Sequence, residues 1–254
     1  MYQTVEVVEN VEITPGFLRL VLQAKEMAAA SEPGQFMMLK AWEGNAPFLM
    51  RPISINYADP VEGTLTFLYK VVGEGTKLMA ALRKGDSMQA LGPLGHGFPL
   101  EKGARRIAVI GRGIGIAPLR LLAKRALDQG TEVYAYLSAK EEAQIFDREE
   151  LAKMGVTVRS TSDANVNVTA FFAEDLKTLP FDAAYSCGSK RLMREMHELH
   201  LRYGFASYVS LEEHMACGIG ACKGCVCKTH DENGSEQYET VCKCGPVFPT
   251  ERIV

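Results

Sequence analysis

The chain has 254 residues and a formal net charge of −3 at pH 7, with 47% hydrophobic and 23% charged residues. These values are typical of a globular protein with two domains, or with one large domain and an appendage. The weak net charge gives no reason to expect nucleic acid or an anionic membrane as a partner, since both select basic surfaces.

The pattern of residues 1–100 predicts an antiparallel β barrel that forms the first domain. Short runs rich in β-branched and aromatic residues alternate there with turn residues. The runs are residues 2–8, 17–23, 35–41, 51–57, 64–72 and 86–91. The clearest alternation places Leu65, Phe67 and Tyr69 on one side of a strand. One helix, from Gly75 to Arg83, interrupts the strands.

Two motifs in this region have the chemistry of a diphosphate site. Arg51-Pro52-Ile53-Ser54 opens a strand, and its guanidinium could bind a diphosphate through two parallel hydrogen bonds. Gly73-Glu74-Gly75-Thr76 precedes the helix, where backbone N–H groups and the Thr76 hydroxyl could receive a phosphate. Taken alone, the first motif is better explained by a surface arginine and the second by an ordinary helix cap. Together, ahead of a nucleotide-type domain, they favour a flavin diphosphate.

From Arg105 the pattern changes to alternating strands and helices, and we expect a second domain over residues 101–210. The expected strands are residues 107–110, 133–137, 156–158, 183–187 and 206–210. One expected helix follows the first strand and ends near residue 129. The other three lie near residues 141–153, 168–177 and 189–203. This alternation predicts a doubly wound parallel sheet.

A glycine turn follows the first strand of this sheet. Gly111, Gly113 and Gly115 form G-x-G-x-G rather than G-x-G-x-x-G, which alone is weak evidence. Its place between the first strand and the first helix is nevertheless where a nucleotide phosphate binds. Cys187-Gly188 ends a later strand at the carboxyl edge, where ligands bind in such sheets, although a buried core cysteine explains Cys187 about equally well.

No segment predicts export or membrane insertion. The most apolar stretch, residues 107–123, is interrupted by Arg112, Arg120 and three glycines. The start of the chain has no basic segment followed by an apolar one, so we expect no signal peptide. A cytoplasmic protein fits best.

The cysteines are concentrated near the end of the chain, over residues 211–254. Cys217, Cys222 and Cys225 have the plant-type spacing C-x₄-C-x₂-C, which with one distant cysteine binds a [2Fe–2S] cluster. Three glycines between them let the loop curl and turn backbone N–H groups toward the sulfurs. Cys242 and Cys244 are both candidates for the fourth ligand, since residues two apart share a face in an extended segment.

Other uses of these cysteines are possible. A four-thiolate zinc site would use Cys222, Cys225, Cys242 and Cys244. Disulfides are less favoured, because the rest of the chain has the composition of a cytosolic enzyme. The C-x₄-C-x₂-C triplet and its glycines favour iron–sulfur over zinc.

The order of these parts resembles the ferredoxin reductase superfamily. Within it, residues 215–222 and Gly245-Pro246-Val247-Phe248 resemble the electron-transfer subunits of NAD-dependent dihydroorotate dehydrogenases. The resemblance covers essentially the whole chain. It implies FAD in the barrel, NAD(P) on the sheet and a [2Fe–2S] cluster in the C-terminal segment.

The resemblance also implies a residue for each contact. The FAD residues would be Arg51, Pro52, Ile53, Ser54, Leu68, Tyr69, Lys70, Gly75 and Thr76. The nicotinamide dinucleotide residues would be Gly111, Gly113, Gly115, Cys187 and Gly188. The cluster ligands would be Cys217, Cys222, Cys225 and Cys242, since the family's fourth ligand stands three positions before the glycine of Gly-Pro-Val-Phe.

The implied activity is electron transfer to or from an FMN-containing dihydroorotate dehydrogenase catalytic subunit, in an assembly of two copies of each subunit. An independent reductase serving a ferredoxin or an oxygenase, and a zinc-stabilised nucleotide-binding module, are the alternatives. Ser138 and Lys140 could bind a ribose 2′-phosphate, so the choice between NADH and NADPH stays open.

This sequence departs from the family pattern at four places. Arg112 and Ser189 stand where the family usually has glycine and proline. Cys244 stands where it usually has aspartate, and Cys227 is an additional thiol.

Overall fold

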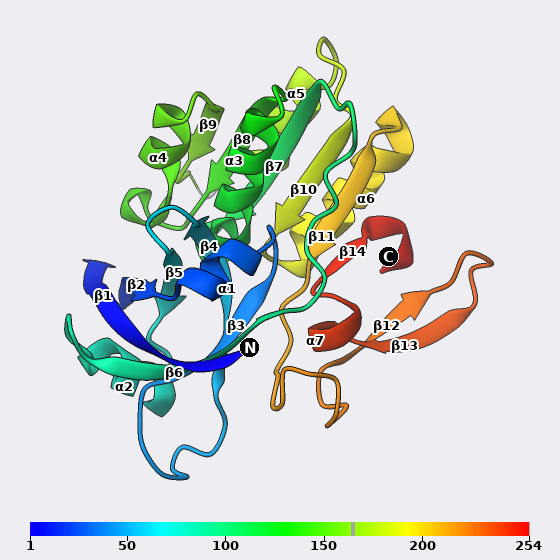
Figure 1. Ribbon diagram of the computed structural model, residues 1–254. Helices are drawn as coiled ribbons and strands as arrows, with labels where there is room; N and C mark the ends of the chain where they lie inside the picture. The colour runs from blue at the N-terminus through cyan, green and yellow to red at the C-terminus, as the bar shows by residue number, and fades with distance from the viewer. Residues whose placement is uncertain (164–165, 254) are drawn as a thin grey trace.

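The computed structural model describes residues 1–163 and 166–253 and consists of three parts (Figure 1). A closed barrel of N-terminal strands lies below a sheet flanked by helices, and the C-terminal segment, orange and red in Figure 1, lies beside both. Val254, the last residue of the expected cluster segment, lies outside the described residues. None of the helices in the described part of the chain has the length and apolar character needed to cross a bilayer.

Six antiparallel strands close the barrel, as the sequence predicts. They are β1 (Tyr2–Thr14), β2 (Phe17–Gln23), β3 (Phe36–Lys40), β4 (Arg51–Asp59), β5 (Thr64–Lys70) and β6 (Ser87–Leu94), in the order β1-β2-β5-β4-β3-β6. Leu65, Phe67 and Tyr69 of β5 are buried in the barrel core, because alternate residues of a strand face the same side. Leu68 faces the other way and is also buried, since it packs into the core of the helix-flanked sheet.

The largest differences from the sequence prediction in this part concern β1, α1 and α2. β1 continues past residue 8 to Thr14, because its more polar second half pairs with β2 in a hairpin. α1 (Lys25–Ala30) was not predicted, since six residues are too short to show helical periodicity. The helix expected from Gly75 to Arg83 is α2 (Glu74–Ala81).

Five parallel strands form the doubly wound sheet, which confirms the predicted fold class. They are β7 (Arg106–Arg112), β8 (Glu132–Ser138), β9 (Thr157–Thr161), β10 (Ala183–Cys187) and β11 (Ala206–Ser210). α3 (Arg120–Asp128) and α4 (Arg148–Lys153) pack on one face, and α5 (Val168–Asp175) and α6 (Lys190–Tyr203) pack on the other. We call these strands and helices the α/β unit.

The main differences from the prediction in the α/β unit lie in the glycine turn and in the helix expected near residues 141–153. The glycine turn continues into a 3₁₀ helix, η1 (Gly113–Leu119), before α3 begins. The helix expected near residues 141–153 is divided into η2 (Glu142–Gln144) and α4, because Asp147 between them has a left-handed backbone with φ 58°.

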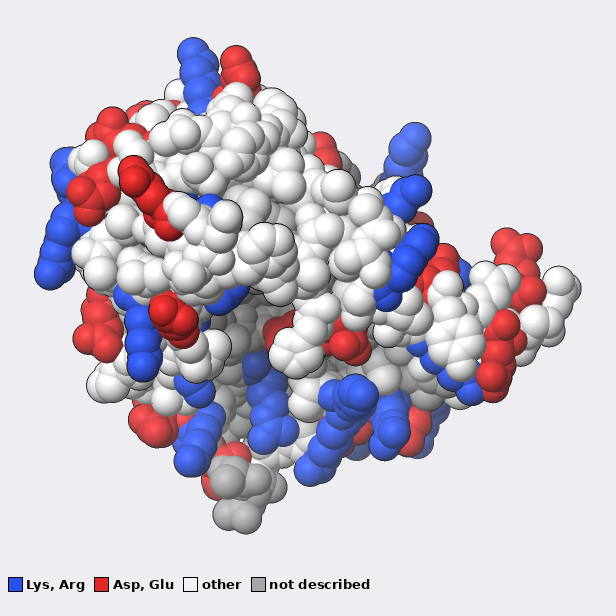
Figure 2. All heavy atoms as spheres, turned by 90° about the horizontal axis from the view of Figure 1, so that it is seen from below, with Lys and Arg blue, Asp and Glu red and all other residues white. Residues whose placement is uncertain are grey.

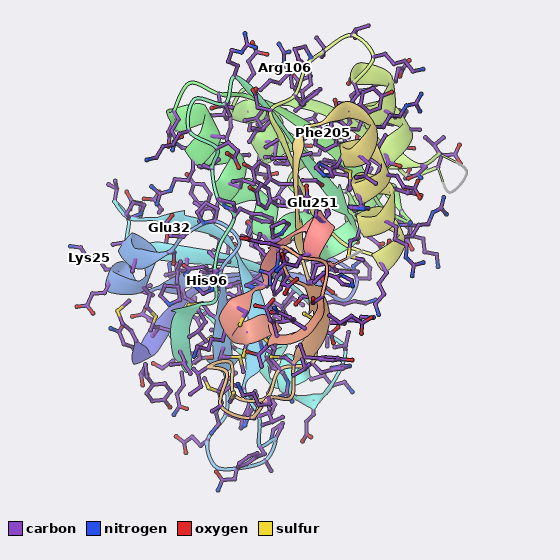
Figure 3. All side chains as sticks on the ribbon, turned by 90° about the vertical axis from the view of Figure 1, so that its right-hand side faces the viewer. Lys25, Glu32, His96, Arg106, Phe205 and Glu251 are labelled. Carbon is purple, nitrogen blue, oxygen red and sulfur yellow. The ribbon has the colours of Figure 1, made fainter. Side chains whose placement is uncertain are left out.

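The C-terminal segment contacts both the barrel and the α/β unit. It contains β12 (Val226–His230), β13 (Glu236–Thr240), α7 (Val241–Cys244), β14 (Val247–Pro249) and η3 (Thr250–Arg252). β14 pairs antiparallel with β11 and completes the sheet order β14-β11-β10-β7-β8-β9. This edge strand was not predicted, because three residues are too few to show an alternating pattern. On the barrel side, the His96 N–H donates to the Gly245 carbonyl at 2.6 Å, and Figure 3 shows His96 beside this segment.

A polar cluster is buried where the barrel meets the α/β unit. The contact around it is apolar, with the ring centroids of Phe17 and Phe146 5.1 Å apart. Asn56 of β4 donates to one oxygen of Asp147 at 2.5 Å, and Arg120 lies 3.6 Å from the other oxygen. Burial raises the pKa of Asp147 to about 6, although Arg120 and Asn56 oppose the shift.

This raised pKa makes stability depend on pH. A carboxyl whose pKa is 3.8 before folding and about 6 in the folded protein stabilises the fold below pH 3.8, and that contribution is lost as pH rises through 6. Between about pH 5 and about pH 7.5, we expect the wild type to lose about 1.4 kcal/mol of unfolding free energy relative to Asp147→Asn. Denaturant unfolding of both proteins at the two pH values measures this difference, and a pH-independent difference would contradict the assignment.

Candidate functional site

A cavity of about 640 Å³ lies where the barrel, the α/β unit and the C-terminal segment meet, and we call it the central cavity. The barrel contributes Phe36, Pro52, Ile53, Ser54, Leu68, Tyr69, Lys70 and Val72; the α/β unit contributes Ile114, Ala117, Pro118 and Lys190; the C-terminal segment contributes Leu211, Glu212, Glu213, His214, Met215 and Pro246. The volume is that of a small-molecule site. Figure 2 shows the underside of the molecule hollowed near its centre, with both basic and acidic side chains around the hollow.

The structure brings six of the expected flavin residues together on the barrel wall of this cavity. They come from β4 (Pro52, Ile53 and Ser54) and from β5 (Leu68, Tyr69 and Lys70), which are neighbours in the barrel. The Tyr69 hydroxyl donates to Asn10 Oδ1 at 3.1 Å, which fixes the ring. Burial raises the pKa of Tyr69 to about 12, so the phenol keeps its proton at neutral pH.

Arg51 and Gly75 adjoin this wall at the start of α2. A side chain at position 75 would place its first carbon 2.5 Å from Arg51 Nε, so glycine leaves the room that the guanidinium occupies. The guanidinium lies over the ring of Trp42, 5.3 Å from the ring centroid, and also donates to the Leu49 carbonyl. Because the first N–H groups of a helix lack intrahelical partners, an anion here would meet both those groups and Arg51.

Thr76 shapes this turn. Its hydroxyl accepts hydrogen bonds from the N–H groups of Val72 and Gly73 at 3.0 and 3.1 Å and donates to the Gly73 carbonyl at 2.9 Å. The hydroxyl therefore caps α2, and a phosphate would meet the backbone N–H groups of Gly75 and Thr76 instead.

The expected dinucleotide residues gather at the carboxyl ends of β7 and β10. Gly111 is paired with Cys187 in the sheet register. A first side-chain carbon at position 115 would lie 2.4 Å from the Cys187 carbonyl oxygen, so Gly115 lets η1 pack directly on the end of β10. Gly113 has φ 56°, a conformation that favours glycine, and Gly188 lies beside Arg112.

The Cys187 thiol is buried, with 2% of the residue exposed, and burial raises its pKa. It therefore stays neutral at physiological pH. Cys187 is not among the described residues that line the central cavity, whereas Lys190 at the start of α6 lines it.

Each of the four expected cluster ligands accepts a hydrogen bond from a backbone N–H group at its sulfur. Gly220 donates to Cys242 at 3.1 Å, and Cys222 donates to Cys217 at 3.4 Å. Gly224 donates to Cys222 at 3.4 Å, and Cys242 donates to Cys225 at 3.3 Å. Such N–H groups stabilise thiolates, so this donor set fits a group that needs four of them.

Cys242 and Cys244 lie on α7 rather than on an extended segment, which corrects the expected geometry. Residues two apart on a helix point in nearly opposite directions, so the two thiols do not share a face. Cys242 is buried beside Cys225, whereas Cys244 is partly exposed. The thiol of Cys227 lies on β12, opposite Glu239, where burial raises its pKa to about 11.

The cluster thiols differ in acidity. Burial opposes ionisation of Cys217, but hydrogen bonds from the backbone N–H groups of Cys222, Ile219 and Ala221 lower its pKa to about 6. Burial and the neighbouring Cys225 raise the pKa of Cys242 to about 12. Cys217 and Cys242 therefore differ in how readily they ionise.

A single-ion site gains no support from the side chains. In residues 1–163 and 166–253, no three His, Cys, Asp or Glu side chains have the arrangement of a site for one metal ion.

Sequence reasoning missed part of the site. Glu212, Glu213 and His214 enter the cavity from the segment between β11 and the cysteine loop, and Lys190 enters from α6. Trp42 lies against Arg51 from a loop with no regular pattern. Residues 212–214 could have been identified from the sequence by their position just after a parallel strand, because ligands bind at the carboxyl edge of such a sheet.

The chain is similar over nearly its full length to curated proteins. Residues 212–254 match the family described as the iron-sulfur cluster binding domain of dihydroorotate dehydrogenase B. The chain is 38% identical over 256 residues to the electron transfer subunit of dihydroorotate dehydrogenase B (NAD⁺) from Bacillus cereus strain B4264, covering 99% of this chain and 98% of that protein. The same identity and coverage hold for the subunit from Bacillus anthracis strain CDC 684 / NRRL 3495.

Solved structures agree on the fold. The superposition on the NADH-dependent reduced ferredoxin-NADP oxidoreductase covers 98% of this chain and 89% of that chain, with a TM-score of 0.84 and 24% sequence identity. A ferredoxin NADP⁺ reductase from Neisseria gonorrhoeae, solved with FAD and NADP, matches 80% of this chain and 92% of its own with a TM-score of 0.63 at 19% identity. Together with the level of identity to the curated subunits, these findings show that the chain belongs to the family of electron transfer subunits of dihydroorotate dehydrogenase B.

Proposed function

We propose that this chain is an oxidoreductase that carries electrons between a nicotinamide dinucleotide and an FMN-containing dihydroorotate dehydrogenase catalytic subunit, in a cytoplasmic assembly of two copies of each. The observation that carries the proposal is the central cavity. Its walls come from the barrel, from the glycine-turn side of the α/β unit and from the approach to the cysteine loop. One bound molecule can therefore adjoin both a dinucleotide and a cluster.

FAD, NAD(P) and a [2Fe–2S] cluster are the cofactors of this proposal. When bound, the flavin supplies the exchange between a two-electron donor and a one-electron carrier. Arg51 and the N–H groups of Gly75 and Thr76 bind its diphosphate, and the barrel wall of the cavity holds its ring. The Tyr69 phenol is held by Asn10 within the barrel core.

Each remaining part of the chain has one task. Gly111, Gly113 and Gly115 let the dinucleotide approach the backbone, with Cys187-Gly188 closing the end of β10 beside them. Cys217, Cys222, Cys225 and Cys242 bind the cluster, and their N–H partners stabilise its thiolates. We assign these tasks to residues 1–100, 101–210 and 211–254 as FAD-binding, NAD(P)-binding and cluster-binding domains.

The proposal predicts an electron carrier that cannot oxidise dihydroorotate or reduce orotate by itself. The part of the chain that the structure describes contains one closed barrel, and no second barrel accompanies it. Anaerobically purified protein should contain FAD, iron and sulfide, and should reduce an artificial acceptor with NADH while leaving orotate unchanged. Addition of the FMN-containing subunit should start orotate reduction.

An assay of orotate by absorbance, with flavin and metal analysis of the same preparation, tests this prediction. Orotate turnover by the single chain would contradict the division of labour. Stoichiometric zinc without flavin would contradict the cofactors.

A further inference from the structure

The buried polar cluster between the barrel and the α/β unit takes no part in the site described above. Asn56 is fully buried on β4, and the side chains of Arg120 and Asp147 are 17% and 6% exposed. Polar groups are costly to bury between two apolar surfaces, so their retention calls for a physical reason.

The three side-chain hydrogen bonds of Asn56 all cross from the barrel to the α/β unit. Its Nδ2 donates to the Ala117 carbonyl at 3.2 Å and to Asp147 Oδ2 at 2.5 Å. Its Oδ1 accepts from Arg120 Nη1 at 3.3 Å. One barrel side chain is thus bonded to η1, to the start of α3 and to the residue before α4.

Asp147 and Arg120, the two charged partners of Asn56, each have an unfavourable local feature. Asp147 has φ 58°, which is uncommon for a residue with a side chain, and its carboxylate does not cap α4. The Arg120 guanidinium lies 4.9 Å from the centroid of the Tyr57 ring, and its Nε is buried without a hydrogen-bond partner. Local strain and an unpaired donor of this kind persist where the surrounding structure needs one fixed arrangement.

Ala117 connects the cluster to the central cavity. It lines the cavity on the side of the α/β unit, while Ile53 and Ser54 line the barrel side. Asn56 lies two residues after Ser54 on the same strand, and it bonds directly to the peptide of Ala117 on the opposite wall. The hydrogen bond therefore fixes the separation of the two walls.

We propose that Asn56 is a positioning residue for hydride transfer. Its bonds to Ala117, Arg120 and Asp147 set the separation between the barrel wall of the central cavity, where the flavin would lie, and the wall from the α/β unit, where the nicotinamide would lie. The inference rests on the proposed function. In that reaction the C–H bond of the reduced nicotinamide breaks, and the hydride with its two electrons passes to the flavin, leaving the oxidised nicotinamide. Apolar contacts such as Phe17 with Phe146 tolerate sliding, whereas hydrogen bonds require a defined geometry.

Single-turnover kinetics of the full chain with its cofactors bound tests the proposal. Because a misplacement of about 1 Å can slow a reaction about 100-fold, Asn56→Ala should lower the limiting rate of flavin reduction at saturating NADH by about 10- to 100-fold. The FAD content, the iron content and the dissociation constant for NADH should stay within about two-fold of wild type, since the residues that bind the cofactors are unchanged. A stopped-flow measurement under anaerobic conditions separates the limiting rate from the binding constant.

A second variant separates positioning from structural support. Asp147→Asn keeps the shape of the side chain, but its NH2 group must face one of the two donors, Asn56 Nδ2 or the Arg120 guanidinium. Loss of the buried charge offsets part of that cost to stability, so the variant should keep its FAD and iron and yet reduce flavin more slowly. The effects of Asn56→Ala and Asp147→Asn should be less than additive, because both act through one contact.

Ser31→Ala is the matched control. The Ser31 hydroxyl is also buried and donates to Met27 at 2.7 Å, but this bond stays within the barrel part. A wild-type limiting rate in Asn56→Ala, or an equal slowing in Ser31→Ala, would overturn the proposal. A wild-type protein that binds no flavin, or whose flavin NADH does not reduce, would instead refute the proposed function, whatever the variants do.

Discussion

Replacement of Cys242 by alanine should abolish the iron–sulfur cluster, whereas Cys244→Ala and Cys227→Ala should keep near wild-type iron. Cys242 is buried beside Cys225, and its sulfur accepts the Gly220 N–H at 3.1 Å. Cys244 points away because α7 is helical, and Cys227 lies on β12 after the loop has ended. Loss of one thiolate of four leaves an iron with an incomplete ligand set.

Anaerobic reconstitution of the three variants, followed by iron and sulfide analysis and electron paramagnetic resonance after reduction, measures the effect. The two variants outside the ligand set serve as matched controls, since each also removes one thiol from the same segment. Cluster loss in Cys244→Ala with retention in Cys242→Ala would reverse the assignment. Loss in both would indicate a site that uses the two thiols together.

Arg51→Ala should weaken FAD binding by about 1.5–3 kcal/mol, or roughly 10- to 150-fold in the dissociation constant. A charge-assisted contact to the diphosphate would be lost, and the space above Gly75 would open to water. Lys77→Ala is the control, because Lys77 is an exposed cation on the same helix α2. The two variants therefore differ in position but not in formal charge.

The single tryptophan gives a direct readout of this contact. Trp42 lies against Arg51, with its Nε1 bonded to the Pro47 carbonyl at 2.7 Å. Titration of flavin-depleted protein with FAD should change the Trp42 fluorescence, with a midpoint shifted to higher FAD in Arg51→Ala and unchanged in Lys77→Ala. Equal midpoints in the two variants would contradict the assignment of Arg51.

Local sequence patterns were sufficient for most of the fold. The alternation in β5 and the strand–helix alternation after Arg105 depend on short-range periodicity, which sequence displays directly. The cysteine spacing was equally informative, because the chemistry of a two-iron cluster constrains it. These are the features that the structure and the comparisons bear out.

The remainder depends on contacts between distant segments. Asn56 and Asp147 are 91 positions apart and have no common motif. Trp42 comes from an irregular loop, and Glu212 enters the cavity only because β11 ends beside the barrel. No periodicity encodes such proximity, so these residues become visible only once the three parts are in place.

The position of β14 links binding of the iron–sulfur cluster to the solubility of the protein. α7, which carries Cys242, leads through Gly245 and Pro246 into β14, the strand that covers the outer edge of β11. In a chain that has not acquired iron, α7 keeps only its hydrogen bonds and packing to the cysteine loop, so β14 should detach more easily. The exposed β11 then offers unpaired N–H and C=O groups to neighbouring chains, which is a common route to aggregation. A chain without iron should accordingly aggregate more readily than one that holds its cluster.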